Sequence, residues 1–226
     1  MYVSSNPTHF HTGDLIGDDC MDPLRGIFFS PNEQRCILTS IKHGAIIVDV
    51  TDVTDVKHIK SYDVRNRVFD VTFHDDNERM VCASEDLLVL SSATGELVST
   101  LREKRTYRVT FLYNPDGLLY VDDNFNVKVM DMNGSDVMTF EGSRIQTMSP
   151  TLKVFDNRRR LVTGENDGTL RVYDVLTGKL LSCFVDHRSD GFVSVAVHPS
   201  GKTLICGNVN KILYILKMGS NAVPRI

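Results

Sequence analysis

The sequence has no apolar run near the roughly 18–20 residues that a membrane-spanning helix needs. We therefore expect no membrane insertion. Residues 1–19 also lack the basic stretch and the apolar core that mark a secretory signal. Together these absences favour an intracellular protein, in the cytoplasm or the nucleus.

The motifs of common catalytic and metal sites are missing as well. The sequence contains no Gly-rich phosphate loop before a helix, no GxSxG elbow and no HExxH pair. It has no CxxC or HxxxH spacing either. The nearest approach to a zinc ligand set is His9-Phe10-His11 with Cys20, which we interpret as a solvated terminal segment. The sequence thus predicts a protein without a metal, a cofactor or a catalytic site.

Cysteine is scarce, and the number of cysteines is odd at five. A stable disulfide framework would normally pair all of its cysteines, so we expect free thiols in a reducing compartment. Cys36, Cys82 and Cys206 fall on the second strand of three predicted repeats. We expect them to be small buried core residues.

A pattern of four short strands and polar turns occurs five times along the chain. The first strands of the repeats are anchored by Phe29, Phe73, Phe111, Phe155 and Val197, at intervals of 44, 38, 44 and 42 residues. A four-stranded repeat of roughly 40–45 residues is typical of β-propeller blades, none of which can bury its apolar faces by itself. We therefore predict an all-β protein of about five blades.

The repeats set the expected boundaries. Residues 1–25 form an N-terminal segment, and the predicted blades cover 26–64, 65–104, 105–143, 144–187 and 188–226. The last repeat lacks a clear fourth strand, because Ala222–Ile226 is short and contains Pro224. Either residues 1–25 supply a closing strand, or the propeller is incomplete and a partner chain donates a strand to the last blade.

The fourth repeat shows the pattern most clearly, with strands expected at Thr151–Phe155, Leu161–Gly164, Thr169–Val175 and Lys179–Val185. The segment LVTGENDGTLRVYDVLTGKLLSCF resembles the WD40-repeat family, with Tyr173-Asp174 where that family usually has Trp-Asp. Polar turns similar to those of the family occur at Ser30-Pro31, Asn114–Gly117 and His198–Gly201. The resemblance covers about 200 residues. It implies a propeller fold and a role in protein interaction.

The chain departs from this family in its bracing residues. WD40 blades are commonly braced by a network of Asp, His, Ser or Thr, and Trp, but this sequence has no Trp and no Gly-His dipeptide. Asp186-His187 is the nearest match to that dipeptide. Thr163, Asp167 and Tyr173 are candidates for a partial network in the fourth repeat, and we expect apolar packing to replace the missing members.

Arginine recurs where one blade leads into the next. Successive positions are 40, 40, 39 and 44 residues apart, and the set comprises Arg25, Arg65 with Arg67, Arg105, Arg144 and Arg188. On one propeller face these guanidinium groups would suit an acidic or phosphorylated peptide. Alternatively, they are solvated residues that pair with neighbouring acids such as Asp63 and Glu103. A second basic patch is Arg158-Arg159-Arg160, in a turn that we assign to the opposite face.

These features favour a non-catalytic interaction scaffold within an intracellular multiprotein assembly. One alternative is an RNA-binding or ribonucleoprotein component that uses the loop arginines, although the net charge of −4 gives no overall basic field. The other is a propeller enzyme with carboxylates at Asp122-Asp123, Glu165 and Asp167. Such residues are more often turn formers, so we do not favour it.

Overall fold

In the computed structural model every regular element of the described residues is a β-strand. The description covers residues 24–40, 44–52, 55–62, 67–113, 116–144, 151–165, 167–187, 191–218 and 224–225. Within these ranges the structure contains no helix that could cross a membrane. The all-β prediction is confirmed for this part of the chain.

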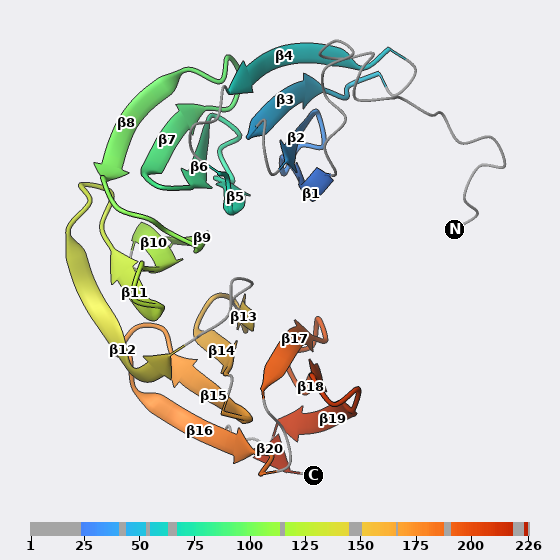
Figure 1. Ribbon diagram of the computed structural model, residues 1–226, viewed down its shortest axis with the longest axis vertical. Coiled ribbons are helices and arrows are strands. Elements are labelled where there is room, and N and C mark those ends of the chain that lie inside the picture. The colour runs from blue at the N-terminus through green and yellow to red at the C-terminus, as the bar shows by residue number, and fades with distance from the viewer. Residues whose placement is uncertain are drawn as a thin grey trace, which may run out of the picture. The chain divides into compact units, whose positions relative to one another are not determined.

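The strands form five antiparallel sheets of four, each a simple meander in chain order (Figure 1). Sheet 1 contains β1 (Leu24–Phe29), β2 (Arg35–Ser40), β3 (Ala45–Asp49) and β4 (Lys57–Tyr62). Sheet 2 contains β5 (Asp70–Phe73), β6 (Arg79–Ala83), β7 (Leu87–Ser91) and β8 (Leu97–Arg102). Sheet 3 contains β9 (Arg108–Tyr113), β10 (Asp116–Val121), β11 (Asn126–Met130) and β12 (Asp136–Arg144).

Sheet 4 contains β13 (Thr151–Phe155), β14 (Arg160–Gly164), β15 (Thr169–Asp174) and β16 (Leu180–Val185). Sheet 5 contains β17 (Phe192–Val197), β18 (Thr203–Asn208), β19 (Leu213–Met218) and the two-residue β20 (Pro224–Arg225). The chain divides into two compact units, residues 1–109 and 110–226. The prediction of about five four-stranded, WD40-like blades is confirmed.

Alternation of side chains and local turn chemistry explain why these strands form where they do. Asp49, Asp131 and Asp174 each follow or end the third strand of their sheet. Their carboxylates accept hydrogen bonds from backbone N–H groups two to four residues later, at 2.8–3.0 Å. Such Asp-capped turns stop one strand and start the next. These hydrogen bonds also lower the pKa of all three carboxyl groups.

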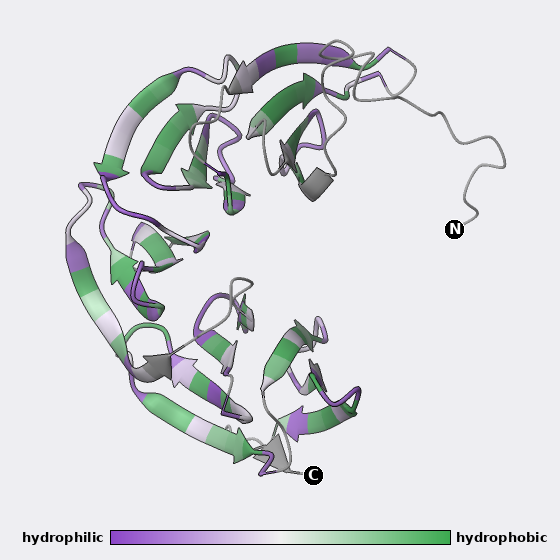
Figure 2. Cartoon of the chain, viewed as in Figure 1, coloured by the Kyte–Doolittle hydropathy of each residue, from purple (hydrophilic) through white to green (hydrophobic). Residues whose placement is uncertain are grey.

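The hydrophobic core lies between the sheets within each unit. In unit 1, sheets 1 and 2 share a cluster that includes Ile37, Ile47 and Met80. In unit 2, sheets 4 and 5 share a second cluster, built in part by Val172 and Phe192. Burying one such side chain contributes about 1.5–3 kcal/mol. Figure 2 shows the hydrophobic residues concentrated on the strands and the hydrophilic ones in the turns.

The cysteines follow the prediction. Cys36, Cys82 and Cys206 are buried and carry free thiols, whereas the free thiol of Cys183 is exposed. Burial raises the pKa of Cys36 to about 11 and the pKa of both Cys82 and Cys206 to about 12. Because the thiolate is the reactive form, these three groups act as core residues and not as nucleophiles.

Sheet 5 ends differently from the other sheets. Within the described residues, β20 pairs only with Lys217 and Met218 of β19. In sheet 4, by contrast, β16 pairs with β15 from Thr169 to Tyr173. The fourth strand of the last repeat is therefore present but short. Residues 1–23, from which a closing strand was predicted, lie outside the described residues.

Candidate functional site

Two of the predicted connection arginines have described side chains, and both lie in unit 1. Arg67 is exposed. Arg105 is held by Glu85, with its Nη2 and Nε atoms each 2.8 Å from one carboxylate oxygen. These hydrogen bonds raise the pKa of Arg105. Arg105 therefore forms a two-point ion pair with the turn between β6 and β7, as the alternative interpretation of these arginines expects.

The remaining members of the arginine set are only partly placed. Arg25 lies in β1 and Arg144 is the last residue of β12, in register with Asn126, so both belong to strands and not to the connections. Their side chains lie outside the described residues, as do Arg65 and Arg188 entirely. A shared arginine surface thus stays a prediction.

Sequence reasoning missed a buried acid in unit 1. The carboxylate of Asp70, on β5, accepts a hydrogen bond from the backbone N–H of Val109 at 3.1 Å and from Nη1 of Arg108 at 3.2 Å. Burial raises the pKa of Asp70 and outweighs the opposing effect of Arg108. This contact ties the start of β9, the first strand of sheet 3, to β5, the first strand of sheet 2. Arg108 and Val109 lie 38 and 39 residues after Asp70 in the sequence, so no local motif could reveal this contact.

Sheet 3 carries an acid–base pair at the turn between β10 and β11. Asp122 is buried, and its carboxylate accepts hydrogen bonds from the backbone N–H groups of Asn124 and Asn126, both at 2.9 Å. Nζ of Lys128 lies 3.2 Å from Asp122 and 3.1 Å from Asp136. Burial lowers the pKa of Lys128, but the two carboxylates outweigh it and raise the pKa overall. Asp122 is therefore a turn former, as predicted.

Sheet 4 has a similar pair at the corresponding turn. Glu165 follows β14 as Asp122 follows β10, and it is buried and paired with Arg171 of β15. Arg171 also lies 3.5 Å from the exposed carboxylate of Asp167. Burial lowers the pKa of Arg171, but the hydrogen bond and charge of Glu165 raise it overall. Asp122 and Glu165 each pair with a basic side chain, which indicates a structural role for both acids.

The partial network expected in the fourth repeat needs a correction. Thr163 and Tyr173 are buried as expected, but Thr163 donates to Glu165 at 3.4 Å, and Glu165 is the central acid. Asp167 is only peripheral, through Arg171. The hydroxyl of Tyr173 donates to the backbone oxygen of Glu141 at 3.2 Å, because its ring packs edge-on against Phe140 of sheet 3. Tyr173 thus joins two sheets of unit 2.

Sheet 5 is braced by a neutral set of donors around one acid. Asp186 is buried, and its Oδ2 accepts hydrogen bonds from Nδ2 of Asn208 at 3.1 Å and from the hydroxyl of Tyr214 at 2.6 Å. The backbone N–H of Asp186 donates to Gly168 of sheet 4 at 2.8 Å. The Asp186-His187 dipeptide noted in the sequence therefore marks a real brace, with Tyr214 as a hydroxyl donor.

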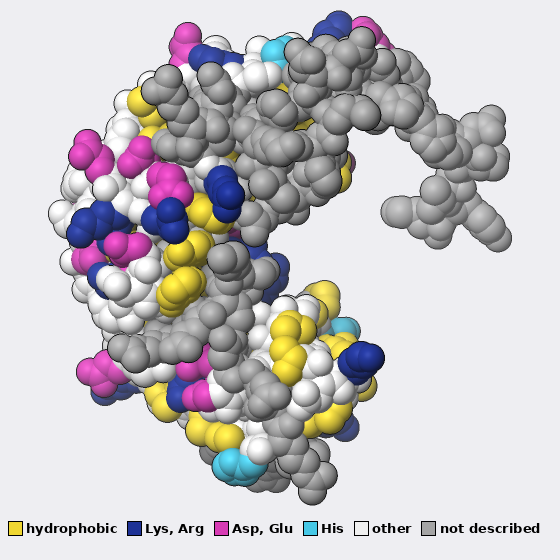
Figure 3. Space-filling view, viewed as in Figure 1, with side chains coloured by type: hydrophobic (Ala, Val, Ile, Leu, Met, Phe, Trp, Pro, Cys, Tyr) yellow, Lys and Arg dark blue, Asp and Glu magenta, His cyan; other side chains and the backbone are white. Residues whose placement is uncertain are grey.

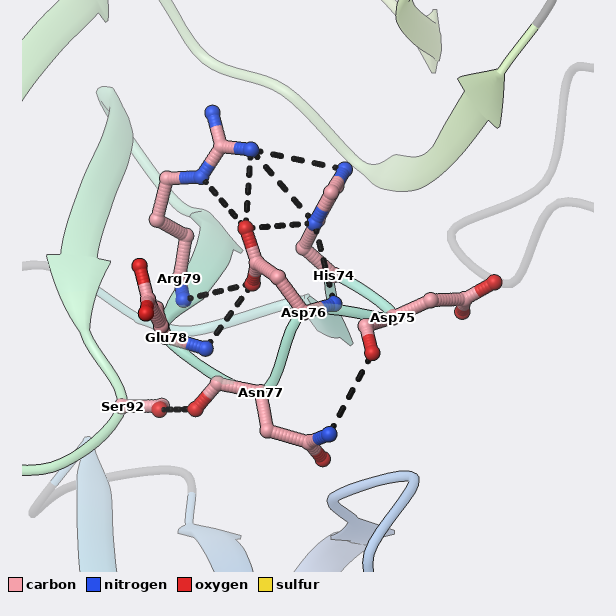
Figure 4. A network of polar contacts seen from close by, with 7 residues as sticks. All are labelled: His74, Asp75, Asp76, Asn77, Glu78, Arg79 and Ser92. Atoms are coloured by element: carbon pink, nitrogen blue, oxygen red, sulfur yellow. Dashed lines mark hydrogen bonds and ion pairs between the residues drawn. The ribbon is translucent and has the colours of Figure 1, made fainter.

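The turn that joins the first strand of a sheet to its second strand is also ordered by polar contacts. In sheet 2, Oδ2 of Asp76 lies 2.7 Å from Nδ1 of His74 and 2.9 Å from Nη2 of Arg79 (Figure 4). Burial raises the pKa of Asp76. Hydrogen bonds to Glu78, Arg79 and His74 have the larger, opposite effect and lower the pKa to about 2. The backbone N–H of Asn32 donates to the side chain of Asn77 at 2.9 Å, which links this turn to sheet 1.

The triple-arginine turn lies between β13 and β14. Asp156, Asn157 and Arg158 all have positive φ, between 50° and 64°. Arg159 is exposed, whereas Nε of Arg160 lies 3.3 Å from the carboxylate of Asp156. Only part of this predicted patch is therefore available to an anionic ligand. Figure 3 shows basic and acidic side chains interspersed on the face that it displays.

The described residues contain no group of three His, Cys, Asp or Glu side chains placed to hold a metal ion. His9, His11 and Cys20, the nearest sequence candidates, lie outside them.

Comparisons with known proteins identify one repeat directly. Residues 178–215, which span β16 to β18 and part of β19, match the family described as WD domain, G-beta repeat. No curated protein matches the chain. WD40 repeats generally mediate interactions between proteins. The matched residues and the five four-stranded sheets make this chain similar to WD40-repeat proteins and consistent with a WD40-like propeller fold.

Proposed function

We propose that the chain is a non-catalytic interaction scaffold and a subunit of an intracellular multiprotein assembly. The observation that carries this proposal is how the buried carboxylates are used. Asp70, Asp122 and Glu165 each hold a basic side chain and brace a turn or connection. Rigid sheets with braced connections are a common means of presenting recognition loops. We therefore assign recognition to the turns and connections of the sheets.

Two further features support an intracellular location and the binding of a partner chain. The buried free thiols of Cys36, Cys82 and Cys206 suit a reducing compartment, in the cytoplasm or nucleus. Among the described residues, the outer edge of β19 pairs with β20 at Lys217 and Met218 alone, which leaves Leu213–Leu216 as an edge to which a partner would add a strand. The backbone of this edge would supply affinity, and alternate side chains would supply specificity.

The test is recovery of partners from native extract. We expect the tagged chain to retain a defined set of proteins at constant stoichiometry, measured by cross-linking and quantitative mass spectrometry. Arg67→Glu combined with Arg105→Glu should remove at least one of them, while the neighbouring exposed Lys104→Glu should remove none. Recovery of no stoichiometric partner would overturn the scaffold proposal. Unchanged recovery with the arginine variant would overturn only the role of these arginines.

A second candidate function is binding to an RNA backbone. The exposed side chains of Arg67 and Arg159 favour it. Purified chain would be titrated with a single-stranded RNA oligonucleotide at about 50 and 200 mM salt, where phosphate contacts weaken steeply. Salt-sensitive binding that Arg159→Glu reduces would support this function. Binding that neither salt nor the variant changes would exclude it.

A further inference from the structure

Unit 2 shows how one sheet of this chain packs on the next. Val162, Leu170 and Val172 of sheet 4 are 0%, 2% and 0% exposed, and they belong to one cluster with residues of sheet 5. The sheet 5 members of this cluster include Phe192, Leu204, Cys206, Leu216 and Met218. Sheet 4 thus has a face that is filled by the following sheet.

Sheet 5 repeats the geometry of sheet 4 position by position. The backbone N–H of Glu165 donates to Thr169 and that of Gly168 to Glu165, and the same bonds run from Asn208 to Ile212 and from Lys211 to Asn208. The strand registers continue this match. Val162 pairs with Val172 in sheet 4, and Ile205 pairs with Ile215 at the equivalent place in sheet 5.

The equivalent face of sheet 5 is open. Ile205, Leu213 and Ile215 take the places of Val162, Leu170 and Val172, yet they are 38%, 66% and 62% exposed. Register places Ala196, Ile205 and Ile215 in one row across three strands, so these apolar side chains share one face. We call this set, Ala196, Ile205, Leu213 and Ile215, the outer face of sheet 5.

A glycine gives an independent sign that another sheet belongs there. Gly164 is needed in sheet 4 because a Cβ at this position would lie 2.8 Å from Cβ of Phe192, the first residue of sheet 5. Gly207 occupies the same register position in sheet 5, but a Cβ there would meet no atom within 4 Å. A glycine inside a strand weakens it and often marks the close approach of another chain segment. Sheet 5 thus keeps the opening for a following sheet.

The matching face occurs on sheet 1. Its register skips a residue between Leu24 and Gly26, as that of sheet 5 does between Phe192 and Ser194, so the first strands can be aligned. By this alignment Ile27 and Phe29 correspond to Val195 and Val197, which pack against the cluster between sheets 4 and 5. Ile27 and Phe29 are 57% and 61% exposed. Sheet 1 therefore offers the type of surface that covers sheet 4.

We propose that the outer face of sheet 5 binds sheet 1 of a second copy of this chain, through Ile27 and Phe29 of β1. The contact is head-to-tail, because it joins two different surfaces of identical chains, and such contacts build rings or open chains of subunits. It would continue the sheet-to-sheet packing already present in unit 2. This inference goes beyond the proposed scaffold function and does not depend on it.

The test uses two variants, each with one face blocked. Ile215→Lys disables the outer face of sheet 5, and Phe29→Lys disables sheet 1, and both positions are exposed, so folding should persist. By analytical ultracentrifugation we expect the unmodified chain to associate as concentration rises and each variant to remain monomeric. An equimolar mixture should form a dimer and nothing larger, since only one intact pair of faces remains.

Two further variants keep the test specific. Gly207→Phe places a ring in the opening, at a position where a Cβ meets no atom within 4 Å, and should weaken association at least 10-fold. Leu97→Lys, at an exposed apolar position of sheet 2, should leave association unchanged. Circular dichroism would confirm that all variants fold. The proposal would be overturned if the unmodified chain stayed monomeric at every concentration or if the mixture formed no dimer. The outer face of sheet 5 would then be covered by a different protein or by another part of the same chain.

Discussion

Sheets 4 and 5 solve the same structural problem with different chemistry. At equivalent positions, sheet 4 has the buried pair Glu165 and Arg171, and sheet 5 has Asn208 and Tyr214, which both donate to Asp186. A full ion pair braces one turn, and neutral donors around a single carboxylate brace the other. The position therefore requires satisfied polar groups and not one fixed residue type.

Removing the base from sheet 4 should have the largest effect. Arg171→Met leaves the carboxylate of Glu165 buried without its cation, so we expect a loss of about 3–5 kcal/mol in the free energy of unfolding. Urea denaturation followed by circular dichroism measures it. The double variant Glu165→Gln with Arg171→Met should recover much of the loss. A single variant as stable as the unmodified chain would show that the ion pair is not a brace.

Removing the acid from sheet 5 should cost somewhat less. Asp186→Ala leaves the buried side-chain amide of Asn208 without its acceptor, at about 1–3 kcal/mol, whereas the hydroxyl of half-buried Tyr214 can bond to water instead. Asp186→Asn keeps an acceptor oxygen and should cost less than Asp186→Ala. The same urea titration compares them. Equal losses for the two variants would contradict a hydrogen-bonding role.

Two matched hydroxyl deletions sharpen the comparison further. Tyr214→Phe removes a hydrogen bond to a carboxylate, which contributes about 1.5–3 kcal/mol, whereas Tyr173→Phe removes one to a backbone carbonyl, which contributes about 0.5–1.5 kcal/mol. We expect the sheet 5 variant to be the less stable of the two in thermal unfolding. The reverse order would mean that the bond between sheets 3 and 4 is the more important one.

The smallest effect is chemical and leaves stability unchanged. Cys183 of sheet 4 is exposed, whereas Cys206 of sheet 5 is buried and has its pKa raised to about 12 by that burial. A thiol reagent at neutral pH should therefore modify Cys183 well before Cys206, as peptide mass spectrometry would record. In urea the two should react alike. Equal rates in the folded protein would indicate that sheet 5 opens readily.

The strands were predictable because their signals are local. Period-two alternation and Asn, Asp or Gly turns placed the four strands of sheet 4 to within one residue at every end. Val175, expected in the third strand, instead follows it, because the carboxylate of Asp174 caps the turn there. A side-chain cap of this kind can end a strand before its apolar pattern ends.

The polar contacts were less predictable because their partners are distant in sequence. Asp70 meets Arg108 across 38 residues, and Asp186 meets Tyr214 across 28. Periodicity does not reveal which acid faces which base once the sheets pack. The pairing of Arg105 with Glu85 was similarly hidden, although an ion pair with a nearby acid was foreseen in kind. Recognition by the arginines remains to be tested.

The short β20 has a consequence for the handling of this protein. In the described residues β20 pairs only with the end of β19, so most of the edge of β19 stays unpaired. This edge includes most of a run of five β-prone residues, Ile212–Leu216, and exposed runs of this kind can seed fibrils. Lys211 and Lys217 flank this run and act as gatekeepers, since a charge at each end discourages stacking of identical strands. Acetylation or loss of these two lysines would convert a tolerated edge into an aggregation hazard.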